Sequence, residues 1–231
     1  MVRPACPAAE RKGRYAWSMI LLTGFEPFGG QSGNPSWDAA VRARTILRGE
    51  GLAVEAVELP CVFGEAAKAL GEALEALEPE LVVCVGQAGG RDRVSLERIA
   101  INCDDAPIPD NAGNQPVDCD VVADGPAAYF SSLPVKAALL AVTMAGIPAE
   151  VSQTAGTYVC NHTFYALMHA LASRPGARGG FVHVPFEPGQ VPAGSAAPSM
   201  PVALMAEAIA VVVRTSLAHT TDLRLAAGST H

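Results

Sequence analysis

A cysteine, a histidine and a glutamate in three separate segments of the chain could together carry out nucleophilic catalysis. Cys160 stands in GTYVCNHTFYALMH, where an alternating stretch that ends in small residues meets apolar residues at helical spacing. This pattern places Cys160 at or near a helix N-terminus, where unpaired backbone N–H groups and the helix dipole lower a thiol pKa and favour the thiolate. The alternative is a small buried thiol, the usual state of a free cysteine.

A thiolate nucleophile needs a base that a third group holds in place. His183, in GGFVHVPF, lies near the carboxyl end of a predicted buried strand and is followed closely by proline. This placement favours a base, and it fits a hydrogen-bonded core histidine equally well. His162 and His169 share the predicted helix of the cysteine and are expected to be surface or packing residues. His219 and His231 fall at the end of the last predicted helix and in the tail.

Glu97, in VSLERIAIN, is the acidic candidate to orient the imidazole. It is predicted to open a strand directly after the glycine-containing loop GQAGGRDR. That loop is not GxGxxG and lacks the Walker lysine, so it favours close backbone approach to a ligand over a phosphate cradle. Four other acids lie in a polar loop and are expected to form turns and caps: Asp104, Asp105, Asp110 and Asp118.

Two phenylalanines, Phe25 and Phe28, occur in the stretch TGFEPFGGQSGNPSWDAA, although aromatic residues make up only 6% of the chain. Either ring alone fits a loop anchor that packs on the core. Two rings beside glycines in a loop after a strand better fit the wall of an apolar pocket.

The elements that must position these residues alternate between short apolar runs and segments of helical period. Strands are predicted at 19–23, 52–59, 81–86, 98–102, 150–154 and 180–184, and helices at 37–47, 64–77, 136–145, 161–172 and 200–219. This alternation predicts an α/β sandwich with a mostly parallel sheet, in which ligands bind beyond the carboxyl ends of the strands. The segments 104–134 and 187–201 are rich in turn residues and are predicted to be irregular.

Composition limits the classes of protein to be considered. The 231 residues are 50% apolar and 17% charged, which predicts one well-packed domain. A net charge of −7 without basic runs argues against binding to nucleic acid or to an anionic membrane surface. No apolar window approaches the roughly 20 residues that span a bilayer, and we expect a cytoplasmic protein. Residues 1–18 are predicted to be a disordered extension, 19–219 the domain, and 220–231 a tail.

The six cysteines form no CxxC pair and show no regular spacing, so they indicate neither a zinc site nor a disulfide framework. We therefore expect reduced thiols. No clustered ligands or HExxH motif suggest a metal.

Several motifs in this order resemble the pyroglutamyl-peptidase I (pyrrolidone-carboxylate peptidase) family of cysteine peptidases: LLTGFEPFGG with NPSW, SLERIAIN followed by DD, IPDN and GNQP, then SQTAGTYVCN and FVHVP. The resemblance runs from about residue 19 to about residue 217. It implies a single-domain three-layer α/β/α sandwich with a twisted central sheet, and removal of N-terminal pyroglutamate from peptides without a metal or cofactor. It also implies a homodimer or homotetramer.

Carried over by motif, the resemblance implies Cys160 as nucleophile, His183 as base and Glu97 as orienting acid. It implies that a neutral lactam ring is held in an apolar slot, with these residues as candidates: Phe25, Phe28, Gln87, Ile108, Tyr158 and Val159. Tyr158 stands where other members often carry phenylalanine.

One departure from the family affects the expected rate. Many members read D-A-R-I-P-D where this chain has Pro107 in place of the arginine. Either the arginine is dispensable or another residue, such as Arg91, replaces it. Oxyanion stabilisation and rate are affected by this difference, and the reaction class is not.

Two other functions are compatible with parts of the sequence. A nucleoside phosphorylase-like enzyme would use GQAGGR over a phosphate, as related α/β folds process nucleosides. A non-catalytic homologue would keep the lactam pocket and lack turnover, for which Pro107 is the only indication. Phosphate-dependent ribose release identifies the first, and binding of 2-pyrrolidone without cleavage identifies the second.

Overall fold

A six-stranded sheet forms the centre of the computed structural model, which describes residues 19–228. The strand order is β2-β1-β3-β8-β4-β7, and every neighbouring pair is parallel except β8 with β4. The strands are β1 (Ile20–Phe25), β2 (Val54–Leu59), β3 (Leu81–Gln87), β4 (Val94–Glu97), β7 (Ala149–Ser152) and β8 (Arg178–Val184). The extension predicted at 1–18 and the last three residues of the predicted tail lie outside the described residues.

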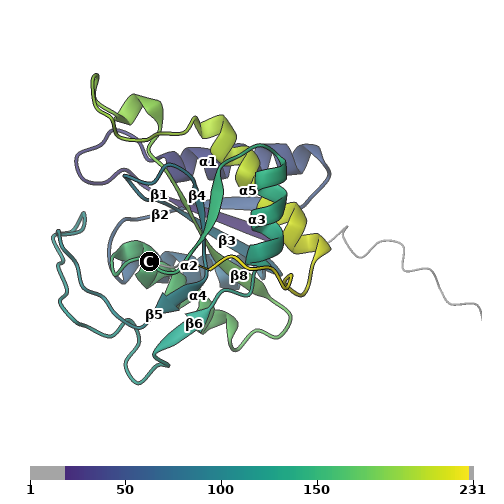
Figure 1. Cartoon of the computed structure of the whole chain (residues 1–231). Helices are drawn as coiled ribbons and strands as arrows, with labels where there is room; N and C mark the ends of the chain where they lie inside the picture. Colours follow the sequence, from purple (N-terminus) through teal and green to yellow (C-terminus); the bar gives the residue numbers. More distant parts are fainter. Residues whose placement is uncertain (1–18, 229–231) are drawn as a thin grey trace, which may run out of the picture.

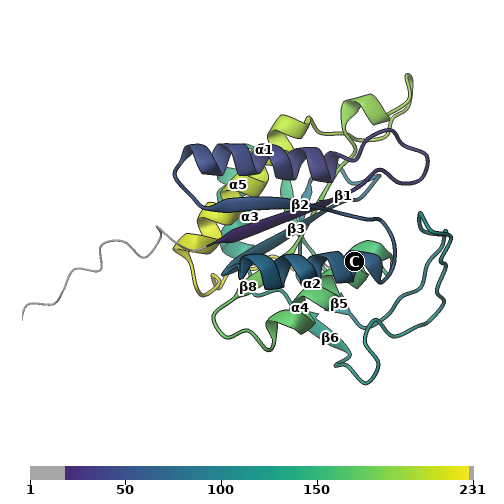
Figure 2. The ribbon, with the colours of Figure 1, turned by 180° about the vertical axis from the view of Figure 1, so that it is seen from behind.

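Helices cover both faces of the sheet, as Figures 1 and 2 show. One face carries α1 (Pro35–Gly49), α3 (Val135–Met144) and α5 (Val202–Ala218), and the other carries α2 (Glu65–Leu77) and α4 (Val159–Leu171). The prediction of a three-layer α/β/α sandwich with a mostly parallel sheet is therefore confirmed. No helix in the described part of the chain is long and apolar enough to cross a membrane.

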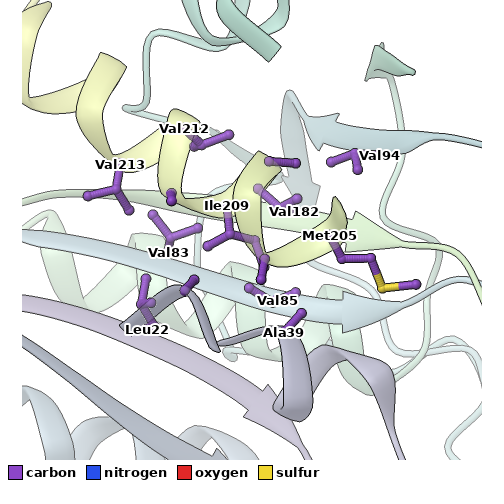
Figure 3. Close-up of a cluster of buried hydrophobic side chains, with 14 of the residues drawn as sticks. Leu22, Ala39, Val83, Val85, Val94, Val182, Met205, Ile209, Val212 and Val213 are labelled. Atoms are coloured by element: carbon purple, nitrogen blue, oxygen red, sulfur yellow. The ribbon is translucent and has the colours of Figure 1, made fainter. Parts of the chain in front are cut away.

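Side-chain alternation along the strands divides the core into two clusters. Leu22, Val83 and Val182 face α1 and α5, where Figure 3 shows them packed against Ile209. The residues one position away along the same strands face α2 and α4 instead, and Phe181 is one of them. Because both faces of the central strands are buried, these strands appear in the sequence as continuous apolar runs.

The strand predicted at 98–102 is present as a shorter strand outside the main sheet, but the expectation that Glu97 opens a strand was wrong. Glu97 closes β4 and does not open a strand, because Val94–Glu97 pairs with β8 and β7. The chain then leaves the main sheet, and β5 (Ile99–Ile101) pairs with β6 (Ala128–Phe130) in a separate two-stranded sheet. The strand β6 lies inside the segment 104–134 that was predicted to be irregular.

The C-terminal tail packs on the domain as far as the structure describes it. The Asp222 carboxylate accepts hydrogen bonds from the backbone N–H groups of Lys136 (3.0 Å) and Ala137 (3.0 Å) at the start of α3. The helix has no side-chain cap of its own at Pro134. A residue of the tail thus satisfies the orphan donors of a helix more than 80 positions away in the sequence.

Candidate active site

The sulfur of Cys160 lies over the sheet at the carboxyl ends of the parallel strands. The helix α4 begins at Val159, so Cys160 is in its first turn, as the sequence predicted. A Cβ atom at Gly86 would lie 2.8 Å from Cys160 Sγ, which means that the sulfur rests against the bare backbone of β3. Gly86 is the register partner of His183 on β8. Neighbouring strands lie about 4.8 Å apart, so the thiol and the imidazole belong to one site.

The protonation state of the thiol differs from the sequence-based expectation. Burial is the main cause that raises the pKa of Cys160 above its ordinary value; the negative charge of Glu97 adds to it, and the positive charge of Arg91 only partly opposes it. The half-buried environment of the thiol thus opposes the effect of the helix N-terminus on its pKa. The thiol must pass its proton to a base when it reacts.

His183 and Glu97 form a buried pair on adjacent strands. The Nδ1 atom of His183 lies 2.8 Å from Oε1 of Glu97, and the side chains are 4% and 0% exposed. Burial alone would raise the pKa of Glu97, but the hydrogen bond with His183 and the charges of His183 and Arg91 outweigh it and lower the pKa. An ionised Glu97 holds the proton of the imidazole on Nδ1, which leaves Nε2 free as a base.

Arg91 completes this cluster. Its guanidinium donates to Oε1 of Glu97 at 2.6 Å and to the carbonyl of Thr154 at 3.2 Å. It therefore ties Glu97 to the loop that precedes α4. This positive charge stands near the thiol although Pro107 occupies the place of the family arginine.

His162 is buried, which differs from the surface position that the sequence allowed. Its Nε2 accepts from the backbone N–H of Gly64 (3.1 Å), and its Nδ1 donates to Oδ2 of Asp104 (2.7 Å). Both ring nitrogens are therefore occupied, and His162 is not available as the base. Asp104, which was expected to form turns or caps, is its partner; the pair links α4 to the start of α2 and to the polar loop.

A small, partly enclosed cavity opens beside Cys160 Sγ. Four residues predicted for the lactam slot line it, namely Phe25, Phe28, Gln87 and Tyr158, together with Asn34, Cys61 and Cys160. Two larger surface hollows contain neither cysteine nor histidine, and we assign no chemistry to them. The cavity at Cys160 is therefore the site that combines a nucleophile with an apolar wall.

The aromatic wall is held by contacts on several sides. Phe28 and Phe63 pack against Tyr158 with ring centroids 6.4 Å and 5.3 Å apart. The hydroxyl of Tyr158 donates to the carbonyl of Pro109 at 3.1 Å. Burial, with the negative charge of Asp110, raises the pKa of Tyr158 to about 12, so the ring stays neutral.

Two predicted pocket residues are not part of this lining. Val159 is completely buried in the cluster between α4 and the sheet, and Ile108 lies on the polar loop with 47% of its surface exposed. Val159 stands between the lining residues Tyr158 and Cys160 in the sequence, which does not reveal that its side chain faces the core. Sequence reasoning missed Cys61, which lies in no motif, and Asn34, which begins the NPSW motif but caps α1 with its side chain.

Cys61 differs from Cys160 in its surroundings. Burial, then the charges of Glu26 and Asp110, raises its pKa to about 12, and no histidine is bonded to it. The five described cysteines are all free thiols, and Cys6 lies outside the described residues. No group of metal-ligating side chains occurs within residues 19–228.

Replacing Gly86 with alanine is expected to lower kcat/KM by about 100-fold, because a catalytic atom displaced by about 1 Å costs that much. The new Cβ would stand 2.8 Å from both Cys160 Sγ and the Phe181 ring. Steady-state kinetics of Gly86→Ala and of the wild type on the same substrate measure this change in kcat/KM. The matched control is Gly71→Ala in the middle of α2, where an added Cβ has open space. Equal activity of Gly86→Ala and wild type would contradict the placement of the sulfur.

A thiol at a helix N-terminus, beside an imidazole held by a carboxylate on an α/β sandwich, defines a cysteine hydrolase. The family model described as pyroglutamyl peptidase matches residues 18–219. The chain belongs to this family, which confirms the resemblance found in its motifs.

Individual relatives agree with this assignment. The chain is 54% identical to the pyrrolidone-carboxylate peptidase of Streptomyces coelicolor and 51% identical to that of Escherichia fergusonii, in each case over 92% of this chain and 99% of the relative. The crystal structure of Bacillus amyloliquefaciens pyroglutamyl peptidase I superposes with a TM-score of 0.85 at 44% identity, covering 90% of this chain and 100% of that chain. A mutant pyrrolidone carboxyl peptidase from Pyrococcus furiosus gives 0.81 at 38% identity, with 87% and 98% covered.

Proposed function

We propose that Cys160, His183 and Glu97 carry out the reaction of this cysteine peptidase, the removal of N-terminal pyroglutamate from peptides. The observation that supports these roles most strongly is the buried hydrogen bond of 2.8 Å between His183 and Glu97. His183 is the register partner of Gly86 on the neighbouring strand β3, and the Cys160 sulfur packs against Gly86. This hydrogen bond provides a base of fixed tautomer beside Cys160. Among the described residues, the other thiol of the cavity, Cys61, has no such base beside it.

The mechanism begins with transfer of the Cys160 proton to Nε2 of His183, while Glu97 stabilises the imidazolium. The sulfur then attacks the pyroglutamyl carbonyl carbon. Backbone N–H groups in the first turn of α4, which has no side-chain cap, stabilise the oxyanion. His183 protonates the departing amine, and water hydrolyses the thioester with His183 as base.

The lactam ring binds in the small cavity at the start of α4. A five-membered neutral ring offers no charge for an ion pair, so apolar walls with a few amide partners discriminate it best. Phe25, Phe28 and Tyr158 provide the walls and Gln87 the amide.

The alternatives fit the site less well. A phosphorylase would need donors for a phosphate around GQAGGR, but Arg91 of that loop is bonded to Glu97 and to a backbone carbonyl. A binding protein without turnover would have no need of an oriented imidazole. The chemistry requires no metal or cofactor.

We further propose that the enzyme acts in the cytoplasm as a homodimer or homotetramer. Three large apolar side chains in or next to the polar loop are exposed and are suitable for subunit contacts: Ile108, Val117 and Phe130. Light scattering during gel filtration measures the assembly directly. A monomer at micromolar concentration would contradict the proposed assembly.

Hydrolysis of pyroglutamyl-aminomethylcoumarin by the purified enzyme in reductant tests the function. We expect turnover of this substrate and none of the free glutamyl analogue. Iodoacetamide is expected to abolish turnover, with peptide mapping placing the label on Cys160. Modification of Cys61 alone with loss of activity would contradict the assignment of the nucleophile.

A further inference from the structure

The orientation of the Gln87 amide in the cavity wall is set by a residue from a distant loop. Nε2 of Gln190 donates to Oε1 of Gln87 at 2.9 Å, and the two residues are 103 positions apart. Gln190 ends the 3-10 helix η1 (Pro188–Gln190), which follows β8. Gln87 is the last residue of β3 and follows Gly86, against which the Cys160 sulfur packs.

Contacts with main-chain groups fix the positions of the oxygen and the nitrogen of the Gln190 side-chain amide. Its Oε1 accepts from the backbone N–H of Glu187 at 3.1 Å, and its Nε2 donates to the backbone carbonyl of Gly33 at 3.3 Å. A backbone N–H can only donate and a backbone carbonyl can only accept, so these two contacts leave one amide orientation. Gln87 must therefore turn its oxygen toward Gln190 and its NH₂ group away from it.

The loop that holds Gln190 is itself anchored to the site. The Phe186 ring packs so closely on Gly89 that an added Cβ there would lie 2.2 Å from it. The backbone N–H of Ala88 donates to the backbone carbonyl of Val184 at 2.9 Å. Gln190 also forms a capping box with Glu187. The orienting amide is therefore fixed relative to β3 and to the loop that contains Phe28.

From these contacts we propose that Gln190 is a positioning residue for specificity. It makes Gln87 present an N–H donor to the bound ring, so that the site selects a ligand with a carbonyl oxygen on that ring. This inference rests on the proposed function and extends it to the source of lactam recognition. A site built around a polar partner rejects analogues that lack it more strongly than an apolar slot does.

Gln190→Glu tests the proposal with almost unchanged shape. A carboxylate cannot donate, so Gln87 would turn its NH₂ toward position 190 and its oxygen toward the lactam carbonyl. We expect KM for pyroglutamyl-aminomethylcoumarin to rise about tenfold or more with kcat changed by less than about threefold, as for lost ground-state binding. Gln190→Met, which frees the Gln87 amide without adding charge, is expected to give a smaller rise. Gln31→Glu, on an exposed loop, controls for added charge.

A double-mutant cycle separates orientation from a structural role. In a Gln87→Met background no amide remains to be oriented, so Gln190→Glu retains only the effect of the lost Gly33 contact and is expected to raise KM by less than about threefold. An equal rise in KM in both backgrounds would overturn the proposal, as would a loss confined to kcat.

A second readout does not depend on turnover. Protection of Cys160 from iodoacetamide by 2-pyrrolidone gives the affinity of the lactam for each variant, and Gln190→Glu is expected to weaken it by the same factor as KM. If the wild type did not hydrolyse the substrate, the proposed function would fail while this comparison still decided the role of Gln190. Unchanged protection in Gln190→Glu would overturn that role.

Discussion

Replacing Cys160 with alanine is expected to lower kcat/KM for pyroglutamyl-aminomethylcoumarin by at least about four orders of magnitude, as for other nucleophile deletions in hydrolases. The variant loses the atom that forms the thioester, and no other cavity thiol has an oriented base beside it. Cys61 lines the same cavity, but its pKa of about 12 keeps it protonated and it has no histidine partner.

The matched control for this prediction is Cys61→Ala, which removes the neighbouring thiol and keeps Cys160, His183 and Glu97. We expect it to retain turnover within about tenfold, since it creates only a small cavity in the pocket wall. Binding of 2-pyrrolidone by Cys160→Ala, measured by calorimetry, should remain near that of wild type. If Cys61→Ala abolished activity and Cys160→Ala did not, the nucleophile would be misassigned.

Glu97→Gln is expected to lower kcat/KM by about three to four orders of magnitude, the size of the corresponding change in serine hydrolases. If the amide NH₂ faces His183, it holds the imidazole in the tautomer that cannot accept the thiol proton. If the amide oxygen faces His183, the tautomer survives, but the charge that stabilises the imidazolium is lost. Either orientation therefore impairs proton transfer from Cys160.

Glu150→Gln is the control for this change, because Glu150 is a carboxylate on the adjacent strand β7 that is bonded to Ser95 at 2.9 Å. We expect it to keep most of the activity. Full activity of Glu97→Gln at neutral pH would show that the imidazole needs no anionic partner, contrary to our assignment.

The lowered pKa of Glu97 also has a consequence for stability. Its folded pKa lies below the ordinary value near 4.5, so the ionised group stabilises the fold above that pH, and this contribution is lost as pH falls through the folded pKa. Urea unfolding of wild type and Glu97→Gln at a series of pH values measures it. The difference in free energy of unfolding should be largest near neutral pH and shrink below about pH 4.5.

The amino-acid sequence by itself determined the class of fold, and it placed two of the three proposed catalytic residues, Cys160 and His183, in the elements where the structure has them. Buried parallel strands and amphipathic helices leave local periodic signals, so the alternation of elements could be predicted. The helix start at Cys160 and the strand end at His183 are likewise local features. The two phenylalanines stood out because they adjoin glycines after a strand.

Only the tertiary structure decided how distant segments meet. The strand that ends at Glu97 pairs antiparallel with β8, and this pairing brings the carboxylate to an imidazole 86 positions away. The Gln190–Gln87 contact likewise joins elements far apart in the chain. Such pairings depend on sheet register and loop packing, which local periodicity does not specify. The burial that raises the pKa of Cys160 has the same origin, because burial is a property of the packed site, whereas the helix start is a local feature of the sequence.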